Sequence, residues 1–313
     1  MDEFALIRRY FGELTAARRG VVRGVGDDAA LLAPAAGRHL VVTCDTLIAG
    51  RHFPLDTAPY DIGWKSLAVN LSDLAAMGAV PRWFLLALSL PSADESWLAQ
   101  FCDGLKVLAD RHGIALVGGD TTRGDLSITI TAMGEVPVGQ ALPRDGARVG
   151  DAVCVTGTLG DAAAGLAALQ DGVRDTPLLS RLNRPEPRVA AGLALHGLAH
   201  AAIDLSDGLA GDLQHILDAS GVGAVVQVDA LPVSGALRRR FPDRESRLPL
   251  QLCGGDDYEL CLCVPPDRLA AARTVLDVPL TVIGEITAER GLRFVDGAGI
   301  TVSVQRTAYR HFS

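Results

Sequence analysis

Aspartates beside small residues, at the ends of apolar segments, are the groups in this chain best suited to chemistry. They recur in six short segments: residues 24–28, 43–46, 70–73, 118–122, 204–208 and 254–257. A carboxylate near a buried core costs several kcal/mol unless it is paired or bound to a metal, and few basic residues stand close in sequence, with Arg123 the nearest. If the segments converge, they form an oxygen-rich, negatively charged site without soft ligands. Mg²⁺ suits such a site and binds it partly through substrate phosphates.

Each segment taken alone has a plainer interpretation. Aspartate beside glycine, serine or threonine is the usual composition of turns and helix N-caps. Convergence in space is not visible in a sequence. The recurrence of six similar segments nevertheless favours a shared site over six separate turns.

Other phosphate-binding and nucleophilic motifs are absent or ambiguous. The sequence contains no G-x-x-x-x-G-K-[ST], which excludes a Walker-type NTPase. Residues 24–29 fit a loose G-x-G-x-x-[GA], but two aspartates stand where a pyrophosphate would approach. Residues 157–160 either cradle a phosphate before a helix or form a plain turn. The seven histidines show no metal-binding spacing, and His52 is distinguished by following the strand that ends near Asp45.

The elements that must position these residues alternate between helices and strands in two halves. In the first half, the apolar pattern predicts an opening amphipathic helix, a helix over 61–77 and another from about 97 to 113, with strands over 40–44, 83–90, 114–117 and 126–136. Residues 137–150, rich in Gly, Pro and Arg, mark the boundary between domains 1–140 and 141–313. In the second half, we expect strands over 153–156, 202–204, 224–228, 258–264, 280–283 and 292–295, with helices after residues 160 and 208. This pattern predicts two α/β layers.

Composition limits the partners and the compartment. The formal net charge of −8 argues against a nucleic-acid partner. The six cysteines form no C-x-x-C pair, and no apolar run approaches the ~18 residues of a membrane span. The start Met1-Asp2-Glu3-Phe4 lacks the features of a signal peptide. We therefore expect reduced thiols, no membrane segment and a cytoplasmic protein.

The ordered set of motifs resembles the thiamine-monophosphate kinase family from the first helix to the last residues. The resemblance is carried by residues 24–32 (GVGDDAALL), 45–53 (DTLIAGRHF), 65–79 (KSLAVNLSDLAAMGA), 118–124 (GGDTTRG), 155–161 (VTGTLGD), 203–209 (IDLSDGL), 254–260 (GGDDYEL) and 309–312 (YRHF). Short motifs such as Gly-Gly-Asp are unspecific individually, whereas the ordered set of motifs is specific.

This resemblance implies a fold, ligands and site residues. The fold would be the two-domain aminoimidazole-ribonucleotide synthetase-like fold, of α/β class (α+β, with mixed sheets). Its N-terminal domain would bind ATP and Mg²⁺ and form a homodimer through its sheet, and its C-terminal domain would close the active site. Positions matching Mg²⁺ ligands are Asp28, Thr43, Cys44, Asp45, Asp73, Asp120, Asp204 and Asp207. Those matching ATP-binding residues are Gly119, Asp120, Arg144 and Ser206, and those matching substrate-binding residues are His52, Asp256 and Phe312.

Two positions depart from the family's pattern. Cys44 stands where the family often has Ser or Thr, so ligation there would use the backbone carbonyl rather than the sulfur. Asp256 stands where the family has glutamate, so its carboxylate is retracted by roughly 1.5 Å. Three arrangements would restore a contact with the substrate: the loop moves inward, a water molecule bridges the gap, or the neighbouring Asp257 makes the contact instead.

The implied reaction is transfer of a phosphoryl group from ATP to thiamine monophosphate, with several Mg²⁺ ions and no catalytic side-chain base. Two alternatives remain. One is another ATP-using enzyme of the superfamily, although this chain lacks the early Cys and Lys of selenophosphate synthetases and the terminal Cys of hydrogenase-maturation proteins. The other is a non-catalytic binding protein, which the intact acidic segments disfavour.

Overall fold

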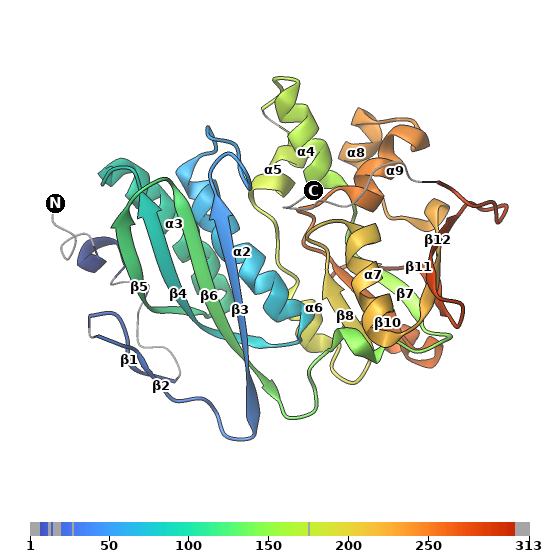
Figure 1. The fold of residues 1–313 in the computed structure, drawn as a ribbon, viewed down its shortest axis with the longest axis horizontal. Coiled ribbons are helices and arrows are strands. Elements are labelled where there is room, and N and C mark those ends of the chain that lie inside the picture. The colour runs from blue at the N-terminus through green and yellow to red at the C-terminus, as the bar shows by residue number, and fades with distance from the viewer. Residues whose placement is uncertain (1–6, 12–13, 15–19, 27, 175, 304–313) are drawn as a thin grey trace. The chain divides into compact units, whose positions relative to one another are not determined.

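The chain divides into two compact units in a computed structural model that describes residues 7–11, 14, 20–26, 28–174 and 176–303 (Figure 1). The first unit comprises Met1–Leu74 and Ala79–Gly139, and the second comprises Ala75–Gly78 and Gln140–Ser313. Each unit is built on one main mixed sheet.

The main sheet of the first unit has four strands in the order β3 (Arg38–Ile48), β6 (Ser127–Pro137), β4 (Val80–Leu90) and β5 (Ala115–Arg123). β6 pairs antiparallel with β3 and β4, and β5 runs parallel to β4. Along β4, buried Phe84, Leu86 and Leu88 alternate with the more exposed Leu85 and Ala87. The period of two buries one face of the sheet and leaves the other more open.

Two long helices cover the buried face, as Figure 1 shows: α2 (Pro59–Ala76) and α3 (Glu95–His112). Asp94 caps the start of α3 by accepting the N–H groups of Ser96 and Trp97, and Gly113 ends it with a left-handed φ of 65°. The two helices approach closely at Gly63 and Gly104. A Cβ on Gly63 would lie 2.0 Å from the Phe101 carbonyl oxygen, so only glycine permits this separation.

A small ribbon of β1 (Val21–Arg23) and β2 (Leu31–Leu32) belongs to the same unit. Val21 and Leu32 pack against a buried cluster that contains Trp83 and Val117. Of the expected opening helix, a helical turn is described at Ile7–Phe11.

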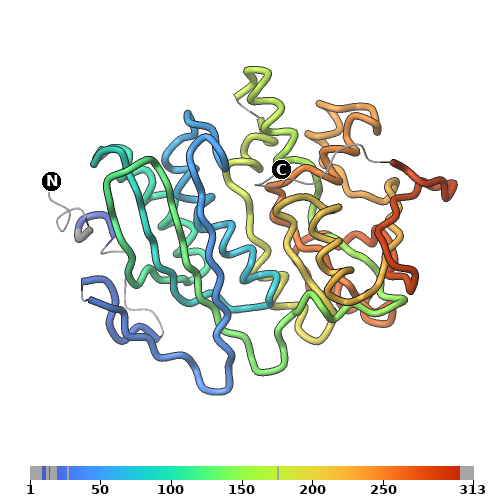
Figure 2. The backbone as a smooth tube through the Cα atoms, viewed as in Figure 1, coloured from blue at the N-terminus to red at the C-terminus, as the bar shows by residue number. Residues whose placement is uncertain are grey.

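The second unit contains a six-stranded mixed sheet. Its order is β12 (Gly291–Val295), β9 (Gly223–Gln227), β11 (Leu280–Thr287), β7 (Ala152–Thr156), β10 (Leu260–Val264) and β8 (Ala201–Asp204). Every residue of β7, β8 and β10 is buried, which explains their continuous apolar runs. Figure 2 traces this backbone from green through yellow to red.

Helices and short 3₁₀ turns connect these strands. The helices are α4 (Asp161–Gln170), α5 (Pro177–Asn183), α6 (Val189–Ala194), α7 (Leu209–Ser220), α8 (Gly235–Arg240), α9 (Arg244–Cys253) and α10 (Leu269–Val275), and the turns are Arg144–Gly146, Val228–Ala230 and Pro266–Arg268. The sequence predicted α4 and α7, whereas the other five helices, of six to ten residues, were not predicted.

The predicted strands are present, with longer or shifted bounds. The largest difference is in β5, which continues through Gly118-Gly119-Asp120 instead of ending there. Gly119 makes this possible, because a Cβ at this position would lie 1.8 Å from the Leu86 carbonyl oxygen of β4. Conversely, β10 begins at Leu260, after Tyr258 with its φ of 50°.

The close contact between α2 and α3 predicts that Gly104→Ala destabilises the protein. Its Cβ would lie 2.0 Å from the Tyr60 carbonyl oxygen, so the helices must separate at a cost of about 1–3 kcal/mol. That cost exceeds the roughly 1 kcal/mol that alanine gains over glycine in a helix. Thermal unfolding should show a lower midpoint. Gly235→Ala is the matched control, since its Cβ meets only the flexible end of Arg239, and an equal midpoint for both variants would contradict the packing argument.

Candidate functional site

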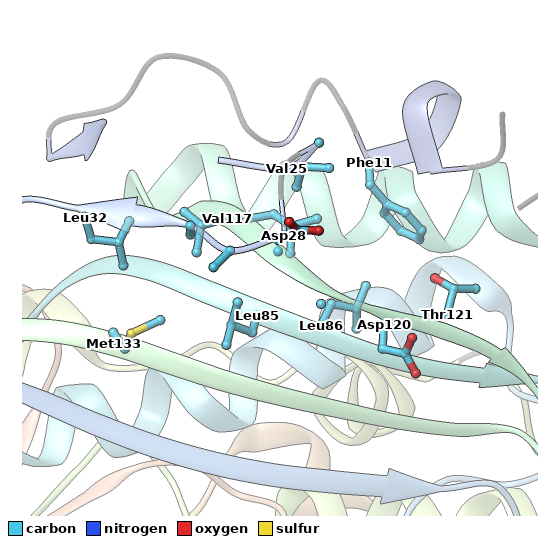
Figure 3. Close-up of a pocket in the computed structure, with 16 residues that line it drawn as sticks. Phe11, Val25, Asp28, Leu32, Leu85, Leu86, Val117, Asp120, Thr121 and Met133 are labelled. Carbon is cyan, nitrogen blue, oxygen red and sulfur yellow. The ribbon is translucent and has the colours of Figure 1, made fainter. Parts of the chain in front are cut away.

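A cavity of about 900 Å³ lies in the first unit, and both Asp28 and Asp120 line it (Figure 3). Its lining also includes Gly26, Gly118 and Gly119. Apolar side chains make up much of the remainder, namely Phe11, Val25, Leu32, Leu85, Leu86, Leu116, Val117 and Met133. The cavity thus combines an apolar surface with two carboxylates and glycine backbone, a lining suited to a ligand with both an apolar part and polar groups.

Thr43, Asp45 and Asp73 form a second group of oxygen atoms in this unit. Thr43 and Asp45 are two residues apart on β3, so they share a face of the sheet, and the Thr43 hydroxyl donates a hydrogen bond to the Asp73 carboxylate of α2. Burial raises the pKa of Asp45 from 3.8 to about 7, and the charge of Asp73 and a hydrogen bond with it add to the effect. The burial and the neighbouring negative charge thus favour the protonated form of Asp45, and a cation at this position would also relieve the repulsion between the two carboxylates.

Cys44 points away from this group. It is exposed and lies between Thr43 and Asp45 on β3, so its side chain is on the opposite face, where its sulfur accepts a hydrogen bond from the Thr131 hydroxyl at 3.3 Å. The side chain of Cys44 therefore does not belong to the Thr43–Asp45–Asp73 group.

His52 lies in the turn that follows β3. Its Nδ1 accepts the N–H of Ile48 at 3.0 Å, so the ring proton of the neutral imidazole is on Nε2. The Lys65 ammonium donates to the His52 carbonyl oxygen at 3.3 Å. These contacts fix both the backbone and the ring of His52.

The loop from β8 to α7 carries Asp204, Ser206 and Asp207 in the second unit. Asp204 is buried at the end of β8. The loop is held by Asp212, a residue that the sequence analysis did not single out, whose carboxylate accepts the N–H groups of Asp207 and Gly208 at 3.0 Å each. Burial and the neighbouring Asp207 raise the pKa of Asp212 to about 7 although these N–H groups favour its ionised form. The available signal in the sequence was the position of Asp212 in the first turn of a helix that follows Asp207-Gly208, where an acidic side chain can accept backbone N–H groups.

Arg144 is exposed at the start of a short 3₁₀ turn that packs beside β8 and α7. Its carbonyl oxygen accepts the hydroxyl of Ser220 at 3.0 Å. The backbone N–H of Ala202 in β8 donates to the carbonyl oxygen of Pro143, the residue before Arg144, at 3.3 Å. These contacts place Arg144 beside the start of β8 and the C-terminal end of α7, whereas Asp204 ends β8 and Asp207 precedes the start of α7.

Asp256 is half-buried and lies against the same loop, because its N–H donates to the Ser206 carbonyl oxygen at 2.9 Å. Asp257 is buried and turned the other way. Its carboxylate accepts the N–H groups of Gly160 and Ala162 at 2.6 and 3.3 Å. Asp257 therefore occupies the start of α4, so it does not substitute for a longer side chain at position 256, and residues 157–160 form a turn already filled by a carboxylate.

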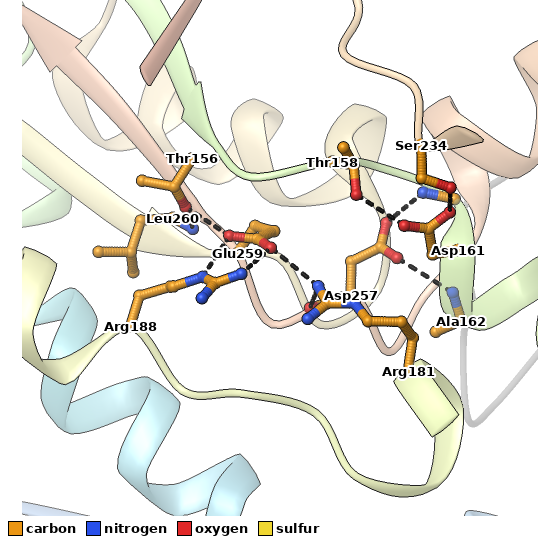
Figure 4. Close-up of polar contacts among 11 residues, drawn as sticks. Thr156, Thr158, Asp161, Ala162, Arg181, Arg188, Ser234, Asp257, Glu259 and Leu260 are labelled. Carbon is orange, nitrogen blue, oxygen red and sulfur yellow. Dashed lines mark hydrogen bonds and ion pairs between the residues drawn. The ribbon is translucent and has the colours of Figure 1, made fainter. Parts of the chain in front are cut away.

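Glu259 is the centre of a buried ionic network that the sequence analysis did not predict (Figure 4). One carboxylate oxygen accepts from Thr156 at 2.7 Å and from Arg188 Nε at 2.6 Å, and the other accepts from Arg181 at 2.8 Å and Arg188 Nη2 at 2.5 Å. A Cβ on Gly157 would lie 2.1 Å from this carboxylate. The available signal in the sequence was Glu259 itself, an acidic residue directly before the apolar strand β10, because a buried carboxylate needs a basic partner.

The donor atoms fit Mg²⁺ better than a metal held by protein alone. Among the residues that the structure describes, no three Asp, Glu, His or Cys side chains gather into a metal-holding group. Asp45 and Asp73 instead supply oxygen atoms as a pair, and Asp28 and Asp120 each line the cavity. Magnesium is commonly bound through one or two carboxylates together with substrate phosphates.

Two further expectations concern the ends and the surface. Phe312 lies outside the described residues. No helix within the described part of the chain is both long and apolar enough to cross a membrane.

Comparison with known proteins gives matches over nearly the whole chain. Residues 26–136 match the N-terminal domain, and residues 148–297 the C-terminal domain, of the AIR synthase related protein family. The thiamine-monophosphate kinase of Salmonella typhimurium is 49% identical over 99% of this chain and 98% of its own length. A crystal structure of thiamine-monophosphate kinase from Stenotrophomonas maltophilia is 52% identical, with a TM-score of 0.87 over 94% of this chain and 96% of that chain. A structure of AaThiL complexed with AMPPCP and TMP is 30% identical, with a TM-score of 0.80 over 99% and 97% of the two chains.

The Asp45–Asp73 pair predicts a pH dependence of stability in the presence of a chelator. Between pH 3.8 and about 7, the folded state keeps a proton on Asp45 that the unfolded state has lost, so stability falls as the pH rises through this window. Asp212, and Asp257 with a pKa raised to about 8, act in the same direction. We expect the thermal midpoint of Asp45→Asn to fall less from pH 5 to pH 8 than that of the wild type. Parallel pH profiles would contradict this role of the pair.

Proposed function

The chain belongs to the thiamine-monophosphate kinase family, and we propose that it transfers the γ-phosphoryl group of ATP directly to thiamine monophosphate, giving thiamine diphosphate and ADP as the last step in making thiamine diphosphate. The similarity to curated kinases extends over 99% of the chain at 49% identity. The related AaThiL structure holds AMPPCP, an ATP analogue, together with TMP. Because both matches extend over nearly the whole chain, they support the same phosphoryl transfer by this protein.

The observation that carries the proposal is the Thr43–Asp45–Asp73 group. In this group the Thr43 hydroxyl contacts the Asp73 carboxylate, and burial together with the charge of Asp73 raises the pKa of Asp45, so a bound cation would relieve the repulsion between the two carboxylates. The transfer of phosphate between two polyanions needs such cations. Unit charges of like sign at ~4 Å repel by about 4 kcal/mol at an effective dielectric of ~20.

No side chain has to act as a general base. The acceptor is a phosphate monoester whose second pKa is about 6, so it is mostly dianionic at neutral pH. The positions that would hold Mg²⁺ are Asp28, Thr43, the backbone carbonyl of Cys44, Asp45, Asp73, Asp120, Asp204 and Asp207. Bound Mg²⁺ supplies charge neutralisation and alignment of phosphate oxygens. The contribution of these residues is to present oxygen atoms from rigid strands, strand ends and helix starts.

ATP is proposed to contact Gly119, Asp120, Arg144 and Ser206. The backbone of Gly119 lines the cavity beside Asp120. Arg144 is exposed and can neutralise phosphate charge. The acceptor is proposed to contact His52, Asp256 and Phe312. Because Nδ1 of His52 accepts the Ile48 N–H, the N–H group at Nε2 is the one that His52 would donate to the acceptor.

The two domains divide this work in our proposal. Residues 1–140 form the ATP- and Mg²⁺-binding domain and the dimer interface, and residues 141–313 close the active site and add Asp204 and Asp207 toward Mg²⁺ and Arg144 and Ser206 toward ATP. All six cysteines are free, as expected in a reducing compartment, and we place the enzyme in the cytoplasm.

A homodimer is proposed to form through the open face of the first sheet. That face presents Leu40, Val42 and Ile48 of β3, which are 47%, 56% and 46% exposed, beside Leu85 of β4 at 36%. These residues lie near one another because β3 and β4 both pair with β6. An apolar strand face of this kind is expected to be covered by a second copy.

The proposed function is tested by following ATP turnover with and without thiamine monophosphate. We expect ADP and thiamine diphosphate in equal amounts, and a strict requirement for Mg²⁺. Aminoimidazole-ribonucleotide synthetase substrate and selenide serve as alternative acceptors. ATP turnover that depends on one of these, and not on thiamine monophosphate, would reject the proposal in favour of another superfamily reaction.

We predict that Asp73→Asn and Asp120→Asn each lower kcat by roughly 10²–10³-fold, because each removes a negative charge that helps to hold cations and phosphates. Initial rates at saturating ATP and Mg²⁺ measure the effect. Asp103→Asn, on the exposed side of α3, is the matched control and should retain wild-type turnover. Wild-type rates for both test variants would remove these aspartates from the metal-binding set.

We predict that Val42→Glu produces a monomer. A charge placed in an apolar interface on both copies costs more than the contact contributes. Sedimentation velocity at micromolar concentration should show a dimer for the wild type and a monomer for the variant. Val107→Glu, on an exposed position of α3 at 43%, is the control. A monomeric wild type would contradict the proposed dimer.

A further inference from the structure

The segment between α9 and β10 has an uncommon backbone conformation. Asp256 and Tyr258 have φ values of 69° and 50°, in the left-handed region that residues with a side chain seldom adopt. Such conformations persist where the surroundings enforce them, and they concentrate at functional sites. Tyr258 is the more unusual of the two, because aspartate enters this region more readily than a bulky aromatic residue.

Backbone contacts hold the segment against the β8–α7 loop. The N–H groups of Asp256 and Tyr258 donate to the carbonyl oxygens of Ser206 and Leu205, each at 2.9 Å. A Cβ on Gly255 would lie 2.5 Å from the Ser206 oxygen, so the two backbones are in close contact. The segment is therefore fixed to the loop that carries the proposed nucleotide-binding and metal-binding positions.

Asp257 holds the centre of the segment from the other side. Its buried carboxylate accepts the N–H groups of Gly160 and Ala162 at the start of α4. With Asp257 directed inward, its two neighbours in the left-handed conformation bring their side chains together. The Tyr258 hydroxyl lies 3.1 Å from Oδ1 of Asp256.

We propose that Tyr258 is a positioning residue for acceptor recognition, whose hydroxyl orients the Asp256 carboxylate toward the amino or cationic part of thiamine monophosphate. This inference rests on the proposed function. Tyr258 is 7% exposed, so its hydroxyl is held by the packing around the residue and donates from a fixed direction. The Asp256 carboxylate is held in turn, and its side chain loses less freedom when a ligand binds.

The hydroxyl also compensates for the short aspartate. The longer glutamate of the family pattern would reach farther into a pocket but would have one more torsion to fix. A carboxylate fixed at one oxygen can recognise an amine or amidine-like edge with defined geometry, directly or through a water molecule. Specificity for the acceptor therefore depends on the Tyr258–Asp256 pair rather than on Asp256 alone.

The test is a double-mutant cycle of Tyr258→Phe and Asp256→Ala in the full-length enzyme, with steady-state kinetics for both substrates. We expect Tyr258→Phe to raise KM for thiamine monophosphate by about 5- to 20-fold, to leave kcat within about twofold, and to leave KM for ATP unchanged. In the Asp256→Ala background, the same substitution should change KM by less than about twofold, because its target is gone. Tyr10→Phe, which loses a hydroxyl bond to the Glu95 carbonyl oxygen, is the matched control and should change neither KM.

The outcomes separate the two proposals. If the wild type forms no thiamine diphosphate, the proposed function fails, and this role fails with it. If the wild type is active and Tyr258→Phe leaves KM unchanged, or raises it equally with and without Asp256, Tyr258 does not act through Asp256. Thermal midpoints of all variants are measured alongside, and a loss of kcat that follows a lowered midpoint would assign Tyr258 a purely structural role.

Discussion

Taking a carboxylate out of water costs more free energy than any single packing contact in this protein provides, and the structure meets that cost differently at each buried acid. Glu259 is neutralised by Arg181 and Arg188. Asp257 and Asp212 rely on backbone N–H groups at the starts of helices, which satisfy the oxygen atoms but leave each pKa raised. Asp45 and Asp73 face each other, and burial together with the charge of Asp73 raises the pKa of Asp45.

This difference separates structural acids from candidate ligands. A carboxylate with two arginines or with several N–H donors has little further capacity to bind an ion. Two carboxylates that face each other with a threonine hydroxyl have that capacity in excess. The same distinction explains why the glycine-rich turn before α4 is not a phosphate site: a side-chain carboxylate from the same unit already accepts its N–H groups.

Close backbone contacts allow these groups to reach their places. Gly119 lets β5 continue beside β4, so Asp120 extends from a strand into the cavity rather than from a free turn. Gly157 leaves space for the Glu259 carboxylate, and Gly255 lets the Asp256 segment lie against Ser206. In each case the absence of a glycine side chain leaves room for the close contact that positions an acidic residue. The glycines of these motifs are therefore needed to place the carboxylates.

The sequence by itself determined the fold class, most strands, both long helices of the first unit and the family, because apolar periodicity and an ordered set of motifs are local signals. It also identified Asp45, Asp73, Asp120 and Asp207 as candidate ligands. It did not predict the five short helices of the second unit, whose few turns carry little periodicity. Only the tertiary structure decided which acids meet: Glu259 finds arginines 71 and 78 residues away, and Asp257 reaches the start of a helix 97 residues earlier. Adjacent residues such as Cys44 and Asp45, or Asp256 and Asp257, look equivalent in sequence, and strand alternation and left-handed turns send their side chains in opposite directions.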